Sequence, residues 1–159
     1  MKSKLLIAAI VALASGNAFA TGTHSGGHDE EMAIGKAGDP AKVSRTIDVT
    51  MMETDDGEMK FEPSVIQTKS GETIRLSFTN KGEVDHEFVM DTQEAVMEHK
   101  AVMEKNPDME HADSNSLRLE PGKKGEIVWT FANAGDFTFA CLIPGHYESG
   151  MHGAISVSK

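Results

Sequence analysis

The chain has 159 residues, with 25 acidic against 15 basic side chains, one cysteine and ten methionines. Its formal charge of −10 repels nucleic acid and anionic lipid, which excludes nucleic-acid binding and favours cations or a basic protein partner. A single cysteine excludes an internal disulfide. In an oxidising compartment such a thiol must be buried, bound to a metal or used in intermolecular chemistry.

The first 20 residues have the pattern of a secretory signal peptide. Two lysines precede an apolar run over residues 5–14, and a small-residue cleavage pattern ends at Ala20. The run is half of the roughly 20 residues that a membrane span needs. Residue 21 is also not a cysteine that could carry a lipid. We therefore expect cleavage after Ala20, export to the periplasm, no membrane insertion and a soluble monomer.

The exported chain begins with a segment that has no apolar period. Residues 21–42 are rich in Gly, His, Asp and Glu, which predicts a flexible arm. From Val43 to Lys159 we expect one domain, because apolar and polar residues alternate there with the period of half-buried strands. About eight strands are predicted, over residues 46–51, 65–69, 73–78, 86–90, 116–119, 126–131, 136–141 and 154–158. Many short strands separated by glycine-containing turns predict an all-β fold, an antiparallel sandwich or barrel.

One segment, at about residues 91–106, departs from the alternation. Asp91 with Glu94 three positions later is a capping box, and Pro107 ends the run. At 100° per residue one face collects Ala95, Val96, His99, Val102 and Met103. We predict a helix inserted in a loop of the β domain.

The stretch CLIPGHYESGMHG, residues 141–153, concentrates metal-binding side chains directly after a predicted strand. Four residues separate Cys141 from His146 and four more separate His146 from Met151, while His86 begins another strand. Two imidazoles, a thiolate and a weak thioether are the ligand set of a mononuclear copper electron-transfer site. The soft sulfur ligands stabilise Cu(I) and the imidazoles accommodate Cu(II). These four residues are therefore the candidate ligands of one type 1 copper ion.

Other interpretations of these residues are open. Cys141 could be an inert core residue, His146 could cap a turn and Met151 could pack the core. Zinc would accept the two histidines and the thiolate, but it has little use for a thioether. A cysteine-nucleophile enzyme would need an oxyanion helix and an orienting third group, and neither is recognisable, so we expect no enzymatic activity. The joint occurrence of Cys, His and Met in a loop with Gly and Pro favours copper.

At these residues the sequence resembles the cupredoxins, or type 1 blue copper proteins. The resemblance covers residues 43–159 and implies a Greek-key β-sandwich that holds copper with the same four ligands. The stretches DHEFVM, LEPG and CLIPGHYESGM, together with the insert, are most similar to the periplasmic cupredoxins linked to bacterial copper tolerance. The gaps between ligands are longer than in plastocyanin-like members, and Glu87 stands where many have a small amide or hydroxyl residue.

The insert and the arm carry further methionines and histidines, which either fill the core or collect copper. His99 and Met103 are four residues apart on one helical face, and Met109 and His111 follow Pro107, so these four form a possible auxiliary copper site. His152 is expected to face solvent.

The predicted function is copper tolerance in the periplasm, by binding and redox handling of copper. One alternative is a soluble electron shuttle with a basic partner such as a c-type cytochrome. Another is a metal-free or zinc-bound structural module.

Overall fold

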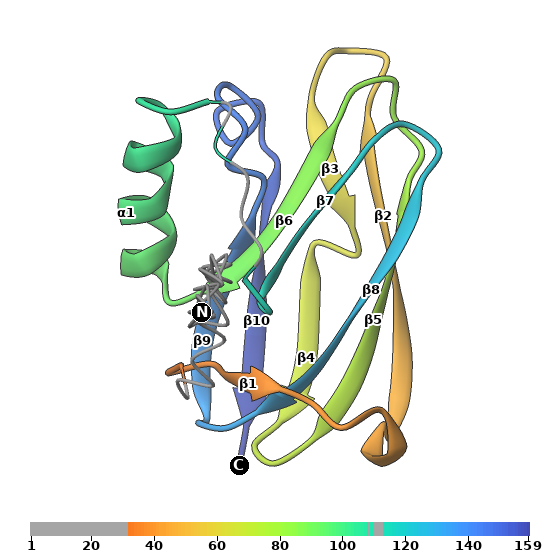
Figure 1. Ribbon diagram of the computed structural model, residues 1–159, viewed down its shortest axis with the longest axis vertical. Helices are drawn as coiled ribbons and strands as arrows, with labels where there is room; N and C mark the ends of the chain where they lie inside the picture. The colour runs from red at the N-terminus through yellow and green to blue at the C-terminus, as the bar shows by residue number, and fades with distance from the viewer. Residues whose placement is uncertain (1–31, 108, 110–112) are drawn as a thin grey trace, which may run out of the picture.

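The computed structural model describes residues 32–107, 109 and 113–159, which form two packed five-stranded sheets, one α-helix and a short 3-10 helix, Pro40–Lys42 (Figure 1). The first sheet has the order β1 (Gly35–Ala37), β8 (Lys124–Phe131), β5 (Thr73–Asn80), β2 (Arg45–Glu53) and β3 (Met59–Glu62). The second has the order β4 (Val65–Lys69), β10 (His152–Ser158), β9 (Gly135–Ala140), β6 (His86–Asp91) and β7 (Ser116–Leu119). Most neighbours are antiparallel, but β2 pairs with β5 and β4 with β10 in parallel. This arrangement confirms the predicted Greek-key sandwich.

The chain crosses several times between the two sheets. Loops that belong to different sheets therefore lie together at one end of the sandwich. It leaves the first sheet after β5, enters the second at β6, returns from β7 to β8 and crosses again to β9. The loop after β5, residues 81–85, and the loop after β9, residues 141–151, therefore lie at the same end, as Figure 1 shows. A site at this end can combine side chains from both sheets.

The eight predicted strands are all present, but alternation alone does not predict β1 and β3. These strands have three and four residues, too few for a periodic pattern of their own. β1 pairs with β8, and Ile34 beside it is fully buried. The prediction of a flexible arm is therefore wrong for residues 32–42, which belong to the sandwich. The remainder of that arm and the predicted signal peptide lie outside the described residues.

The core between the sheets is aromatic at its centre. The rings of Phe88 and Phe139 stack with their centroids 5.2 Å apart, and Phe61 packs edge-on against both of them. These arrangements are the ones that aromatic quadrupoles favour. Phe137, Phe139 and Cys141 all belong to this core, as the alternation of residues 136–141 predicts. The sulfur of Cys141 is thereby placed inside the sandwich.

The helix α1 (Gln93–Met103) lies on the outer face of the second sheet (Figure 1). Its N-cap is Thr92, whose hydroxyl accepts a hydrogen bond of 3.2 Å from the Ala95 N–H, and not the predicted Asp91. The carboxylate of Asp91 instead accepts from the Thr92 N–H at 2.7 Å.

No helix among the described residues is long and apolar enough to cross a membrane.

The apolar face of α1 is narrower than predicted. Val96 and Met103 are buried against Val89, Ala140 and Leu142 of the second sheet and the following loop. Val102 is 45% exposed, because it lies at the edge of the stripe and faces away from the sheet. The insert is therefore docked on the sandwich by one row of side chains.

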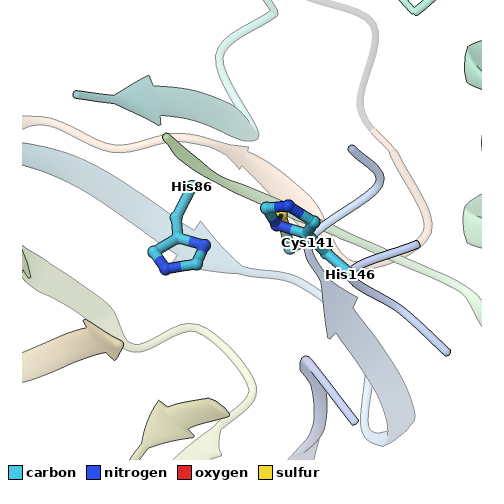
Figure 2. Close-up of side chains that lie close together, drawn as sticks. All are labelled: His86, Cys141 and His146. Atoms are coloured by element: carbon cyan, nitrogen blue, oxygen red, sulfur yellow. Dashed lines mark hydrogen bonds between the residues drawn. The ribbon is translucent and has the colours of Figure 1, made fainter. Parts of the chain in front are cut away.

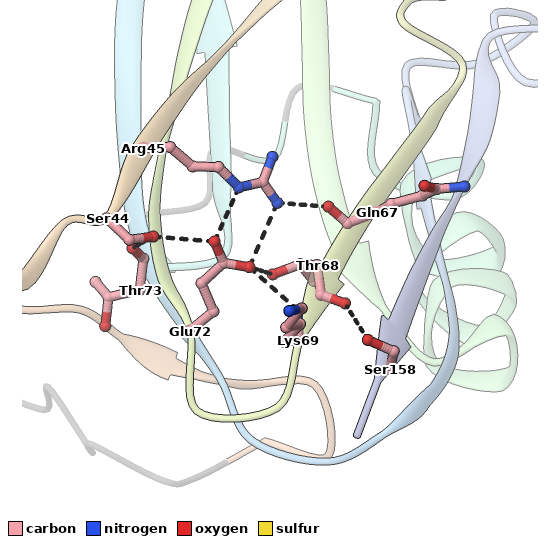
Figure 3. A network of polar contacts seen from close by, with 8 residues as sticks. All are labelled: Ser44, Arg45, Gln67, Thr68, Lys69, Glu72, Thr73 and Ser158. Atoms are coloured by element: carbon pink, nitrogen blue, oxygen red, sulfur yellow. Dashed lines mark hydrogen bonds and ion pairs between the residues drawn. The ribbon is translucent and has the colours of Figure 1, made fainter.

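A polar network at the opposite end of the sandwich joins β2, β4 and the turn before β5 (Figure 3). The carboxylate of Glu72 accepts hydrogen bonds from the Arg45 guanidinium at 2.8 Å, the Thr68 hydroxyl at 2.8 Å and the Ser44 hydroxyl at 2.9 Å. The hydrogen bond from Arg45 is the largest influence on the pKa of Glu72, and against the effect of burial these contacts lower that pKa to about 2. Glu72 thus connects both sheets through charge-assisted bonds.

Glu72→Gln should lower the free energy of unfolding at pH 7 by about 2 kcal/mol, because hydrogen bonds to a charged acceptor are lost. Since the folded pKa lies below the ordinary 4.5, this contribution is present above pH 4.5 and disappears as the pH falls toward 2. Urea unfolding of the metal-free protein should therefore show the wild type and the variant converging in acid. Glu126→Gln is the control, because Glu126 pairs with Arg75 and is 60% exposed, and it should cost less than about 1 kcal/mol. A pH-independent difference for Glu72→Gln would contradict this account.

Candidate metal site

His86, Cys141 and His146 converge at the end of the sandwich where the chain crosses between the sheets (Figure 2). Their candidate ligand atoms, one per residue, all lie within 4.8 Å of one another. β6 and β9 are antiparallel neighbours, so the first residue of β6, His86, lies beside the end of β9, where Cys141 follows. His86 and Cys141 are fully buried, and His146 is half-buried. The predicted His, Cys and His set is thus brought together in three dimensions.

The loop over residues 141–151 is closed by its own backbone. The Cys141 N–H donates to the Met151 carbonyl at 3.0 Å, and the Met151 N–H donates to the His146 carbonyl at 3.1 Å. Gly145 and Gly150 have φ values of 90° and 95°, which only glycine adopts without strain. These bonds place the backbones of Cys141, His146 and Met151 side by side, although four residues separate each of them from the next in sequence.

Met151 is fully buried in the core that also contains Cys141. Its backbone bonds place it beside Cys141 and His146. The next residue, His152, is exposed, as expected from the sequence, and its ring stacks on Tyr147 at 4.6 Å. His152 is therefore not among the residues that converge on the buried sulfur.

The sulfur of Cys141 has two close polar neighbours. The backbone N–H of Glu87 donates to Sγ at 3.3 Å, and Nδ1 of His146 lies 3.3 Å from Sγ. Burial raises the pKa of the thiol to about 12, although the Glu87 N–H acts in the opposite direction. Because this N–H belongs to the backbone, the contact does not depend on the unusual side chain at position 87.

The surroundings of both histidines favour the neutral imidazole, the form that binds metal ions. Burial lowers the pKa of His86 against the attraction of Glu53, and burial followed by repulsion from His86 lowers the pKa of His146. Nδ1 of His86 is buried and has no hydrogen-bond partner within the described part of the chain, whereas the buried Nε2 has the Glu53 carboxylate 3.1 Å away, without the alignment of a hydrogen bond. Unpaired buried nitrogen atoms are costly unless they bind a ligand. The donor set and its surroundings therefore fit a metal ion such as copper.

Glu53 is a neighbour of the site that the sequence pattern does not reveal. Its Oε1 atom lies 3.1 Å from Nε2 of His86, although 33 positions separate the two residues. Glu53 occupies the last position of β2, in the first sheet, and His86 belongs to the second. Only the crossing of the chain between sheets brings them together, so no local motif could have identified Glu53.

Met103, one of the residues predicted to form an auxiliary copper site, is buried. Met103 is 1% exposed in the apolar cluster beneath the helix, and Met109 packs against the same cluster. Met103 therefore packs between the helix and the sheet, and its sharing of an ion with His99 stays a prediction. His99 is half-buried, and His111 lies outside the described residues.

Comparisons with known proteins agree with this geometry. Residues 48–158 match the family described as copper binding proteins, plastocyanin/azurin family. The copper-resistant cuproprotein CopI of Rubrivivax gelatinosus is 45% identical over 136 residues, which are 86% of this chain and 79% of that protein. CopI of Pseudomonas aeruginosa is 35% identical over 79% of this chain and 82% of its own length.

Among solved structures, dithionite-reduced auracyanin from Roseiflexus castenholzii has the same fold, with a TM-score of 0.60 at 23% identity, covering 74% of this chain and 99% of that one. The fold, the sequence match and the cluster of buried donor atoms lead to one conclusion. The chain belongs to the plastocyanin/azurin family of copper-binding proteins.

Proposed function

We propose that this protein binds one copper ion as a type 1 site and acts in copper tolerance in the periplasm. His86, Cys141 and His146 would be the principal ligands and Met151 the weak axial ligand. The observation that carries the proposal is the convergence of a buried thiol and two imidazoles, with candidate ligand atoms within 4.8 Å of one another, in a member of a copper-binding family.

The chain's own residues supply binding, orientation and exclusion of water. Copper, when bound, supplies a one-electron couple between Cu(I) and Cu(II). The two sheets hold His86 and Cys141 in a fully buried position, and the closed loop holds His146 and Met151 against them. A rigid arrangement of mixed soft and imidazole ligands suits both oxidation states. The Glu87 N–H, 3.3 Å from the sulfur, would stabilise the thiolate form that binds a metal ion.

The role in tolerance is supported by the relatives. The two CopI proteins, 45% and 35% identical, are named copper-resistant cuproproteins. The ten methionines and seven histidines of the chain are also more than one copper site requires. A second copper held by His99, Met103, Met109 and His111 stays a prediction, as does a basic redox partner such as a c-type cytochrome.

Deletion of the gene in its source bacterium should raise copper sensitivity and leave respiratory growth in copper-poor medium intact. A plasmid copy of the wild type should restore tolerance, and its product, cleaved after Ala20, should be found in the periplasmic fraction. Cys141→Ser should not restore tolerance if the redox site itself is needed. Met97→Leu is the matched control, because Met97 is an exposed methionine on α1 outside the site, and this variant should restore tolerance fully. Lost respiratory growth with unchanged copper tolerance would make the electron shuttle the correct function.

A further inference from the structure

Glu53 is a carboxylate from one sheet placed against a candidate copper ligand of the other. Its Oε1 atom lies 3.1 Å from Nε2 of His86, and its side chain is 24% exposed while that of His86 is fully buried. β2 ends at Glu53, and the loop before His86 covers this strand end through a bond from the Lys81 N–H to the Met51 carbonyl at 2.8 Å. The contact is therefore built into the junction between the two sheets.

The backbone of the loop over residues 81–85 holds the carboxylate of Glu53 in place independently of the histidine. The Glu83 N–H donates to Oε2 at 2.9 Å, and the Val84 N–H donates to Oε1 at 3.2 Å. Burial would raise the pKa of Glu53, but these N–H groups outweigh it and keep that pKa below its ordinary value. A Cβ atom at Gly82 would lie 2.2 Å from Oε2, so the absence of a side chain at position 82 makes room for the carboxylate.

The position of Glu53 determines which nitrogen of His86 is available to a metal. Oε1 of Glu53 lies 3.1 Å from Nε2, so the negative charge of the carboxylate favours a proton on that nitrogen, which leaves the lone pair on Nδ1. Metal-binding histidines commonly present their second nitrogen to a carboxylate or carbonyl, which sets the tautomer and raises the basicity of the ligand.

The charge of a second carboxylate near His86 is compensated. Asp85, the adjacent carboxylate, is bonded to the Arg118 guanidinium at 3.0 Å, so this pair contributes little net charge. The carboxylate of Glu53 accepts only from backbone N–H groups and faces the imidazole, which leaves its negative charge uncompensated by a cation within the described contacts.

We propose that Glu53 is a positioning residue that directs Nδ1 of His86 to the copper ion and favours Cu(II) over Cu(I) in the bound state. This inference rests on the proposed copper site. Cu(II) carries one more positive charge than Cu(I), so a fixed negative charge behind the ligand stabilises the oxidised form more. A more basic imidazole acts in the same direction, because Cu(II) is the better acceptor for nitrogen ligands. Glu53 thus lowers the reduction potential of the site.

The first test is the pair Glu53→Gln and Glu83→Gln, because each removes one negative charge from the same end of the molecule. Glu53→Gln should weaken Cu(II) binding about tenfold more than Cu(I) binding, within the range found when outer partners of metal ligands are removed. This tenfold change in the ratio is a potential increase of about 59 mV for a one-electron couple. Glu83 contributes its backbone N–H to the contact, and its side chain is exposed, so Glu83→Gln should change the ratio less than about twofold.

A second variant moves the carboxylate without removing its charge. Gly82→Ala places a methyl group 2.2 Å from the present position of Oε2, so the flexible end of Glu53 must leave its present position beside His86. The ratio of Cu(II) to Cu(I) affinity should fall in the same direction as in Glu53→Gln. Competition with chelators of known affinity for each oxidation state, redox titration and urea unfolding of the metal-free proteins provide the measurements.

The outcomes separate this inference from the copper site on which it rests. If the wild type forms no coloured copper complex, the proposed copper site itself is wrong. A coloured wild type in which Glu53→Gln and Glu83→Gln shift the potential equally overturns the role of Glu53 alone. Equal loss of Cu(I) and Cu(II) affinity in Glu53→Gln, accompanied by lower stability of the metal-free protein, also overturns it, because a merely structural contact would do the same.

Discussion

Cys141→Ser should abolish the intense visible absorption of the copper-loaded protein and weaken copper binding by more than about 100-fold, the upper cost of losing an outer partner. The chain has one cysteine, so no other thiolate can supply charge transfer to Cu(II). Histidine nitrogens and carboxylate oxygens do not produce a band of that intensity, and a serine hydroxyl does not replace the soft ligand. An absorption spectrum after addition of Cu(II), with a chelator competition for affinity, measures both effects.

The control for this variant is its folding. Cys141 is fully buried beside the aromatic core, and serine is of similar size, so the metal-free variant should keep the native near-ultraviolet circular dichroism. Its free energy of unfolding should fall by about 1–3 kcal/mol, the cost of a buried hydroxyl with an incomplete set of partners. A folded Cys141→Ser variant that retains the coloured site would show that the copper ligand is not this sulfur.

His86→Ala and Met151→Leu should affect different properties of the copper site, the first its affinity and the second its reduction potential. Removal of His86 takes away a strong equatorial ligand, and copper affinity should fall by more than about 100-fold, beyond the cost of an outer partner. Met151→Leu should keep the coloured site and raise its potential, because an axial thioether tunes the copper more than it holds it. Redox titration and chelator competition on both variants test this difference.

The stability of the metal-free Met151→Leu variant is the control for this comparison. Met151 is fully buried, and leucine has nearly the same volume, so the metal-free variant should lose less than about 1.5 kcal/mol. If both variants lose copper to the same extent, Met151 is a principal ligand and the site is not a type 1 centre with a weak axial bond.

Much of the fold follows from local periodicity. The alternation of residues 136–141 places Phe137, Phe139 and Cys141 on one face, and the structure buries that face between the sheets. A period of two encodes which side chains turn inward whatever strand lies beside them. β1 and β3 are too short for this signal, and they form because neighbouring strands offer an edge to pair with.

In the helix, periodicity alone does not determine which side chains are buried. A helical stripe over residues 95–103 includes the neighbours Val102 and Met103, and of these two only Met103 is buried. Adjacent residues on a helix lie about 100° apart, and which edge of the stripe touches the sheet depends on how the helix is docked. The same docking encloses Met103, which the sequence alone allows to be a copper ligand.

The candidate ligands could be named before the structure because their chemistry is rare and three of them share one short segment. Cys141, His146 and Met151 are linked by the loop's own hydrogen bonds, so their proximity is a local property of residues 141–151. His86 and Glu53 belong to different sheets, and their approach depends on the register of β6 against β9 and on the crossing after β5. Local sequence thus determines which residues can bind a metal, whereas tertiary structure decides which nitrogen of His86 faces a carboxylate, because that contact is made across the sandwich.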